Sequence, residues 1–168
     1  MALLIDPHKA HACLEALTEG TIRLGILEAQ CGADAVLISS AFAGSGFISR
    51  EFYEEFVLPY ENKVIAGIKA VHDIPLYTHT CGGIGDRLDL MMETGTNGID
   101  TLDPPPLGTV EFATAIAQTK GKVFIKGNID PVNELIRGSE RDIEKAVTRL
   151  LKIAKQGGGY IMCSACSV

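Results

Sequence analysis

Apolar residues along this chain fall into five short runs typical of buried β-strands, separated by longer segments with helical spacing. The five runs cover residues 35–39, 75–79, 98–102, 123–127 and 159–163. Helical spacing of apolar residues is found in residues 8–30, 49–72 and 131–156. In the first of these segments leucines recur at intervals of three, seven and three, which predicts one buried helix face made of Leu14, Leu17, Leu24 and Leu27.

Helix-start signals support these predictions. Asp6-Pro7 and Asp130-Pro131 each place a carboxylate that can cap a helix before a proline suited to its first turn. Ser139 begins a weak variant of the capping box, so the third helical segment is predicted to break at Gly138. Asp130 is accordingly interpreted as a helix cap and not as a catalytic acid.

Alternation of strands and helices predicts an α/β fold with a parallel sheet, forming a single domain over residues 1–168. Two architectures compete: a complete five-stranded doubly wound sheet, and part of a (β/α)₈ TIM barrel, which needs about 250 residues. No helix follows the last apparent strand, although a parallel sheet needs both faces covered. This favours the partial barrel, with about five parallel strands adjacent in sequence order.

Composition narrows the class of partner. The 15 basic and 21 acidic residues give a formal net charge of −6, which argues against nucleic acid or an anionic membrane as partner. No apolar run approaches the roughly 18 residues that span a bilayer, and Asp6 interrupts the N-terminal run too early for a signal peptide. We therefore expect a cytoplasmic protein whose five cysteines are thiols, ligands or nucleophiles.

The sharpest local motif is His79-Thr-Cys81-Gly-Gly83, at the end of the second strand run. Residues two apart on a strand point to the same face, and the carboxyl ends of parallel strands are where sites are built. An imidazole and a thiol on one face suit Zn²⁺. A buried histidine and a buried cysteine without further function would produce the same pattern.

A second motif, Cys163-Ser-Ala-Cys166, follows the fifth run. One cysteine from it would complete a three-ligand site with a position open for substrate, whereas both would close a structural four-ligand site. Their odd separation places them on opposite faces if the strand continues, so one is favoured, and Cys166 is chosen because it lies further into the loop. A redox pair is a third interpretation, but its usual strand-then-helix context is missing.

Polar residues at two further strand ends are candidates for lining the same site. They are Asn128, beside the predicted cap Asp130, and Asp103, in the rigid Leu102-Asp-Pro-Pro-Pro106 loop. Asp100 lies inside the strand run, before Asp103, and one of these two carboxylates is expected to be functional.

Six segments, in order, resemble the uroporphyrinogen decarboxylase superfamily: Gly32-Ala-Asp-Ala, Phe56-Val-Leu-Pro-Tyr60, His79-Thr-Cys-Gly, Gly127-Asn-Ile-Asp-Pro, Gly158-Gly-Tyr-Ile161 and Ala165-Cys166. Each segment alone is weak, but their order and spacing are specific and cover nearly the whole chain. The resemblance implies the carboxyl-terminal half of a family barrel. Its open sheet edges predict either pairing with another copy or another chain, or a fragment of a longer product.

Within that superfamily the pattern is most similar to the corrinoid:coenzyme M methyltransferases. This implies a zinc site formed by His79, Cys81 and Cys166, and methyl transfer from a methylated corrinoid, carried by a partner protein, to a small thiol. The cobalamin would arrive with that partner, since nothing in the chain resembles a cobalamin-binding module. The alternatives are the tetrapyrrole carboxy-lyase reaction of the decarboxylases, which needs no metal, and a non-catalytic zinc or interaction module that uses Cys163 as fourth ligand.

Overall fold

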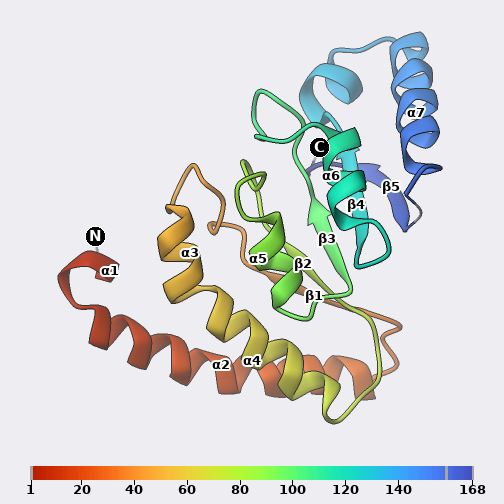
Figure 1. Ribbon diagram of the computed structural model, residues 1–168. Helices are drawn as coiled ribbons and strands as arrows, with labels where there is room; N and C mark the ends of the chain where they lie inside the picture. The colour runs from red at the N-terminus through yellow and green to blue at the C-terminus, as the bar shows by residue number, and fades with distance from the viewer. Residues whose placement is uncertain (1, 158, 168) are drawn as a thin grey trace.

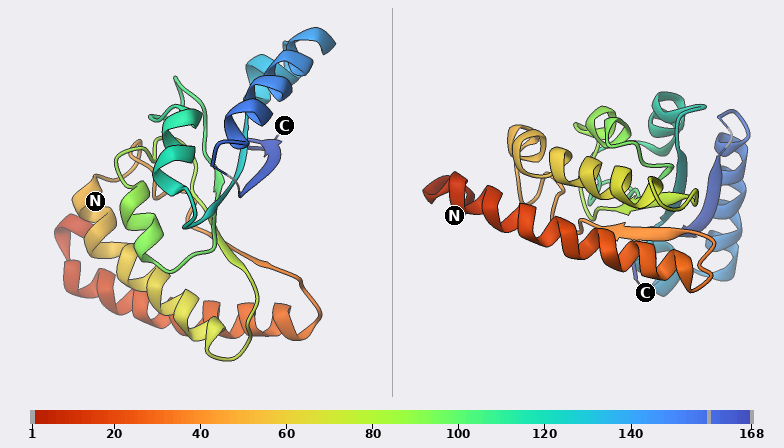
Figure 2. Two further views of the ribbon diagram at one scale, coloured as in Figure 1. Left: turned by 45° about the vertical axis from the view of Figure 1, so that its right-hand side comes forward. Right: turned by 90° about the horizontal axis from the view of Figure 1, so that it is seen from below.

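The protein, seen in a computed structural model that describes residues 2–157 and 159–167, is a curved sheet with its helices on one side (Figure 1 and Figure 2). The strands are β1 (Val36–Ser39), β2 (Leu76–His79), β3 (Gly98–Thr101), β4 (Phe124–Ile129) and β5 (Tyr160–Ser164). The helices are α1 (Ala2–Ile5), α2 (Pro7–Gln30), α3 (Arg50–Phe56), α4 (Leu58–Lys69), α5 (Leu88–Glu93), α6 (Phe112–Thr119), the π-helical η1 (Pro131–Ile136) and α7 (Glu140–Ala154).

The sheet follows the order of the sequence. Every strand pairs in parallel with the next one along the chain, in the order β1-β2-β3-β4-β5. This confirms the prediction of adjacent strands as in part of a barrel, and it excludes the shuffled order of a doubly wound sheet. The carboxyl ends of all five strands therefore lie along one edge, where a barrel places its site.

The two faces of the sheet differ in what covers them. Val36 and Ile38 of β1 are buried in a cluster with residues of α2 and α4. Leu37, which alternates with them, is 42% exposed, and Ile161 of β5 is 47% exposed. Because successive side chains on a strand point to opposite faces, the helices cover one face, and the other corresponds to the interior of a barrel.

The predicted buried face of α2 is wrong. Leu17, Leu24 and Leu27 are 67%, 57% and 54% exposed, while Thr18 and Gly25 are buried. A Cβ at Gly25 would overlap the side chain of Ile68 on α4. The helix packs through the face on which a glycine lets its neighbour approach closely, so the leucine stripe is left outside.

The capping predictions are confirmed. Asp6 accepts from the Lys9 N–H at 3.0 Å at the start of α2. Ser139 and Asp142 form a complete capping box at the start of α7, after a break that contains Gly138. The segment predicted as one helix over residues 49–72 is two helices, α3 and α4, because Pro59 in the first turn of α4 has no N–H to continue the ladder. Among the described residues, no helix combines the length and apolar character needed to cross a membrane.

One buried carboxyl, that of Glu61, is in the first turn of α4. Glu61 is 4% exposed, and its Oε2 accepts from the Tyr53 hydroxyl at 2.8 Å. Its Oε1 is buried and has no hydrogen-bond partner among the described residues. Burial raises the pKa of Glu61 above the ordinary carboxyl value of 4.5, although hydrogen bonds oppose it. The folded state therefore favours the neutral acid.

Replacing Glu61 with glutamine is expected to change how stability depends on pH. A pKa raised by folding contributes stability that is complete below the unfolded pKa and lost as the pH rises through the folded pKa. The wild type should therefore lose stability relative to Glu61→Gln as the pH rises from about 4.5 to about 8. Urea unfolding across this range measures the difference. A difference that stays constant with pH would contradict the prediction.

Candidate metal centre

The carboxyl ends of β2, β3 and β4 place three side chains in one row on the inner face. In the register of the sheet, His79 is opposite Asp100, and Asp100 is opposite Lys126. Asp100 Oδ2 lies 3.0 Å from His79 Nδ1, and Asp100 Oδ1 accepts from Lys126 Nζ at 2.7 Å. Partial burial lowers the pKa of Lys126, but Asp100 outweighs it and raises that pKa overall. Asp100 is thus shared between a cation and the imidazole.

Cys81 meets the other side of that imidazole. Its Sγ is 3.2 Å from His79 Nε2, while Nδ1 faces Asp100 and lies 2.6 Å from Thr101 Oγ1. A carboxylate only accepts, so the Asp100 contact is satisfied when Nδ1 carries the proton. The lone pair of Nε2 is then directed toward Cys81. A carboxylate behind a histidine is the arrangement that orients histidine ligands of metals.

The turn after Cys81 depends on Gly82 and Asp103. Gly82 has a φ of +80°, which favours glycine, and its N–H donates to Asp103 Oδ2 at 2.6 Å. Asp103 is 1% exposed, and its Oδ1 has no partner among the described residues. Burial raises the pKa of Asp103, although Gly82 and His79 pull it down. Asp103 therefore anchors the cysteine turn with one oxygen, while the other is buried.

The two late cysteines have different neighbours. Burial and then the neighbouring Cys166 thiol raise the pKa of Cys81 to about 11. Cys163 is paired instead with Asn128 in the sheet, and its Sγ is 3.9 Å from Ser164 Oγ. Cys166 is thus the late cysteine whose thiol neighbours that of Cys81.

Asn128 is at the carboxyl end of β4 with a φ of +95°. It is 2% exposed, and its Nδ2 donates to the carbonyl of Leu102 at 2.6 Å. This bond ties β4 to the turn after β3. The observed contact is structural, and contact with a bound cofactor stays a prediction.

The donor set of His79 and Cys81 fits a zinc ion. Bonds of about 2.3 Å to sulfur and 2.0–2.1 Å to nitrogen place two tetrahedral ligands about 3.6 Å apart. The observed 3.2 Å separation needs only a small opening. Across residues 2–157 and 159–167, no set of three or more His, Cys, Asp or Glu side chains already has metal-site spacing. The chain therefore presents two converging ligands, with Cys166 beside the second.

Two residues of this region escaped the sequence prediction. Lys126 became visible only through the strand register, which pairs it with Asp100. Arg87 is 0% exposed and lies in the loop after Cys81, where it donates to the carbonyl of Ala43 at 2.7 Å. An arginine at a helix start carries no sequence signal of burial, so only the structure could identify it.

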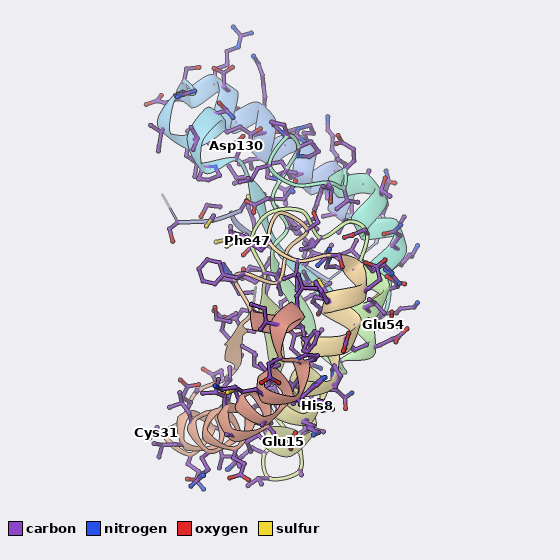
Figure 3. The ribbon with its side chains drawn as sticks, turned by 90° about the vertical axis from the view of Figure 1, so that its left-hand side faces the viewer. His8, Glu15, Cys31, Phe47, Glu54 and Asp130 are labelled. Atoms are coloured by element: carbon purple, nitrogen blue, oxygen red, sulfur yellow. The ribbon has the colours of Figure 1, made fainter. Side chains whose placement is uncertain are left out.

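The remaining cysteines lie apart from this region. From the sequence, Cys13 and Cys31 are most simply interpreted as core or interface thiols; both are exposed, so neither lies in the core. Figure 3 shows Cys31 at the opposite end of the molecule from Asp130, which follows β4 at the carboxyl edge of the sheet. These two thiols are useful controls for the chemistry of the others.

Asp130 is confirmed as a helix cap, and its replacement by asparagine is expected to be nearly neutral. Its Oδ1 accepts from the N–H groups of Val132 and Asn133, each at 2.8 Å. Asparagine offers the same acceptor, so Asp130→Asn should leave stability and metal binding close to wild type, while Asp130→Ala should lose about 1 kcal/mol. Urea unfolding and zinc titration measure both. A loss of zinc affinity in Asp130→Asn at unchanged stability would show a role beyond capping.

The fold and this strand-end region define an α/β protein of the TIM-barrel type, with five consecutive parallel strands and a His/Cys cluster at their carboxyl ends. The family model described as Uroporphyrinogen decarboxylase (URO-D) matches residues 1–168. The chain belongs to this family.

Similar proteins include two kinds of enzyme. Methylcobamide:CoM methyltransferase MtbA of Methanosarcina acetivorans is 34% identical over 122 residues, which cover 73% of this chain and 34% of that protein. Uroporphyrinogen decarboxylase of Acinetobacter baumannii (strain SDF) is 33% identical over 162 residues, which cover 93% of this chain and 43% of that protein. The chain thus spans less than half the length of these relatives, and identity alone does not separate the two reactions.

A solved structure supports the fold. A methyltransferase from Methanosarcina mazei superimposes with a TM-score of 0.77 at 18% identity, covering 94% of this chain and 43% of that chain. At this identity the likeness establishes the architecture alone. It agrees with the partial barrel that the strand order defines.

Proposed function

We propose that this chain carries the zinc site of an enzyme that transfers a methyl group from a methylated corrinoid protein to a small thiol. The observation that carries the proposal is the convergence of His79 Nε2 and Cys81 Sγ at 3.2 Å, with Asp100 behind the histidine. Cys166 is proposed as the third ligand because its thiol neighbours that of Cys81. The identity to MtbA, named a methylcobamide:CoM methyltransferase, supports the same reaction class.

Each residue has a definite task in this proposal. His79 and Cys81 hold the ion, Asp100 keeps the Nδ1 proton and so directs Nε2 toward the site, and Lys126 balances the charge of Asp100. Bound zinc stabilises a coordinated thiol as its thiolate at neutral pH, which makes it a nucleophile. Three protein ligands leave a fourth position for that thiol. The carboxyl edge of the strands, where these residues lie, would be the face open to a partner protein that carries the methylated corrinoid.

The decarboxylase relatives provide the second candidate, a tetrapyrrole carboxy-lyase. The His79 and Cys81 pair favours the methyltransferase, because a carboxy-lyase that needs no metal has no use for a histidine directed at a cysteine. A closed structural zinc site is a third candidate. It would need Cys163 as its fourth ligand, so the zinc content of Cys163→Ala tests it.

Cobalt substitution tests the proposal directly. The purified chain is loaded with Co²⁺, and its visible spectrum is followed during titration with coenzyme M and, as control, with ethanesulfonate, which lacks the thiol. We expect a thiolate-to-cobalt band that grows with coenzyme M alone, and slower demethylation of methylcobalamin in Cys81→Ala than in the wild type. A chain that binds no metal and decarboxylates uroporphyrinogen would refute the proposal.

A further inference from the structure

The loop that follows β1 runs beside the proposed ligand segment. This β1–α3 loop, residues 40–48, continues the pairing of β1 with β2 beyond the ends of both strands. Its Ser40 N–H donates to the His79 carbonyl at 2.9 Å, and the Cys81 N–H donates to the Ala41 carbonyl at 3.3 Å. Further along, the Ser45 N–H donates to the Gly83 carbonyl at 2.7 Å. The backbone is thus held at His79, at Cys81 and at the second residue beyond it.

The contact between the two segments has no room for an extra atom at one position. A Cβ at Gly44 would overlap the carbonyl oxygen of Cys81, which is backbone and cannot turn aside. Gly46, in the same loop, has nothing within 4 Å of the position that a Cβ would occupy. Gly44 therefore sets how closely the loop approaches Cys81, and Gly46 does not.

A fully buried arginine fixes the other side of the loop. Arg87 donates to the carbonyls of Ala43 at 2.7 Å and Ile48 at 3.2 Å, near the middle and at the end of the loop. Asp86 neutralises its guanidinium through contacts of 2.9 and 3.0 Å, and the group lies 5.5 Å from the centre of the Tyr53 ring. Arg87 is 0% exposed. Arg87, which follows Cys81 in the chain, thus binds the β1–α3 loop through two carbonyls.

We propose that Gly44 and Arg87 are positioning residues for the metal centre, acting through the β1–α3 loop as a rigid template for the backbone of His79–Gly83. The inference rests on the proposed metal site. It deepens that proposal: the 3.2 Å distance between His79 Nε2 and Cys81 Sγ depends on the backbone of His79–Gly83, and the β1–α3 loop holds that backbone in place. Both residues act through the backbone and not through the side chains of His79 and Cys81.

The test compares matched pairs of variants: Gly44→Ala with Gly46→Ala, and Arg87→Lys with Arg50→Lys. Arg50 pairs with Asp89 at 2.6 Å and donates to the carbonyl of Asp86, and among the described residues it has no hydrogen bond to the loop. Lysine carries its donors on one nitrogen and lacks the planar fork with which the guanidinium spans two carbonyls and the carboxylate of Asp86. Affinity for Co²⁺, counted per folded chain, should fall roughly tenfold or more in Gly44→Ala and Arg87→Lys, and stay within about twofold in both controls.

Hydrogen exchange of the metal-free chain separates this inference from the proposed function. The amides of Ser40, Ser45 and Cys81 should exchange faster in Gly44→Ala and Arg87→Lys than in the two controls. A residue that only stabilises the fold would instead raise exchange across the whole sheet. If the wild type bound no Co²⁺, the proposed function would fail, and the exchange result would still decide the template. Unchanged exchange and unchanged metal affinity in Gly44→Ala would overturn it.

Discussion

Cys81→Ala is expected to hold almost no zinc. The wild type should bind close to one zinc per chain, and the variant less than about a tenth of that, because three ligands become two and the one beside His79 is gone. Metal analysis after gel filtration measures the content. Circular dichroism should show the same fold, since Cys81 is only partly buried and alanine fits its place.

The other cysteines complete this experiment. Cys166→Ala should lose zinc like Cys81→Ala, while Cys163→Ala should keep it, because the proposed third ligand is Cys166, whose thiol neighbours that of Cys81. Cys31→Ala is the control for the loss of a thiol as such, since Cys31 is exposed and distant (Figure 3). Zinc retained in Cys166→Ala and lost in Cys163→Ala would show that the third ligand was chosen wrongly. Full zinc in Cys81→Ala would remove the site altogether.

Asp100→Ala is expected to weaken zinc binding by about 10- to 100-fold without abolishing it, as loss of a carboxylate behind a histidine ligand does. The imidazole loses the acceptor at 3.0 Å that fixes its proton on Nδ1. Competition with a chromophoric chelator measures the dissociation constant.

Two comparisons isolate the role of Asp100. Asp89→Ala also breaks an ion pair, with Arg50, on the exposed surface, and should leave zinc affinity unchanged. Asp100→Ala leaves Lys126 unpaired, so the double variant with Lys126→Met separates that charge from the loss of histidine orientation. Equal affinities for Asp100→Ala, Asp89→Ala and the wild type would contradict an orienting role.

The strands were within reach of the sequence, because apolar runs and capping pairs are local signals, and their order was predicted from the family resemblance and the uncovered last strand. All five strands lie within two residues of their predicted runs, and Asp6, Asp130 and Ser139 cap as predicted. The buried face of α2 could not be predicted from the sequence. A hydrophobic pattern gives weight to leucine and none to glycine, whereas this helix packs where Gly25 meets Ile68, and Gly67 of α4 meets Ile22 in return.

In the candidate site, too, local spacing was predictable and contacts between distant segments were not. His79 and Cys81 are two residues apart on one strand, so spacing alone predicted that they share a face. Their supports come from other strands and loops: Asp100 through the register of β3, Lys126 through that of β4, and Arg87 through burial. No pattern within one segment of sequence encodes which residues stand opposite each other in a sheet, so these partners needed the structure.

The sequential strand order also bears on how the chain folds. Each strand pairs with its neighbour along the chain, and the loop between paired residues is shortest for β2 and β3, where Tyr77 pairs with Gly98, and longest for β1 and β2, where Val36 pairs with Leu76. The entropy lost on closing a loop grows with its length, and short-range pairings speed folding. The strands that carry His79 and Asp100 are therefore the pair whose association is opposed least by chain entropy. The pairing that brings the histidine and its orienting carboxylate together thus closes a shorter loop than the pairing of β4 with β5, which brings in the segment that leads to Cys166.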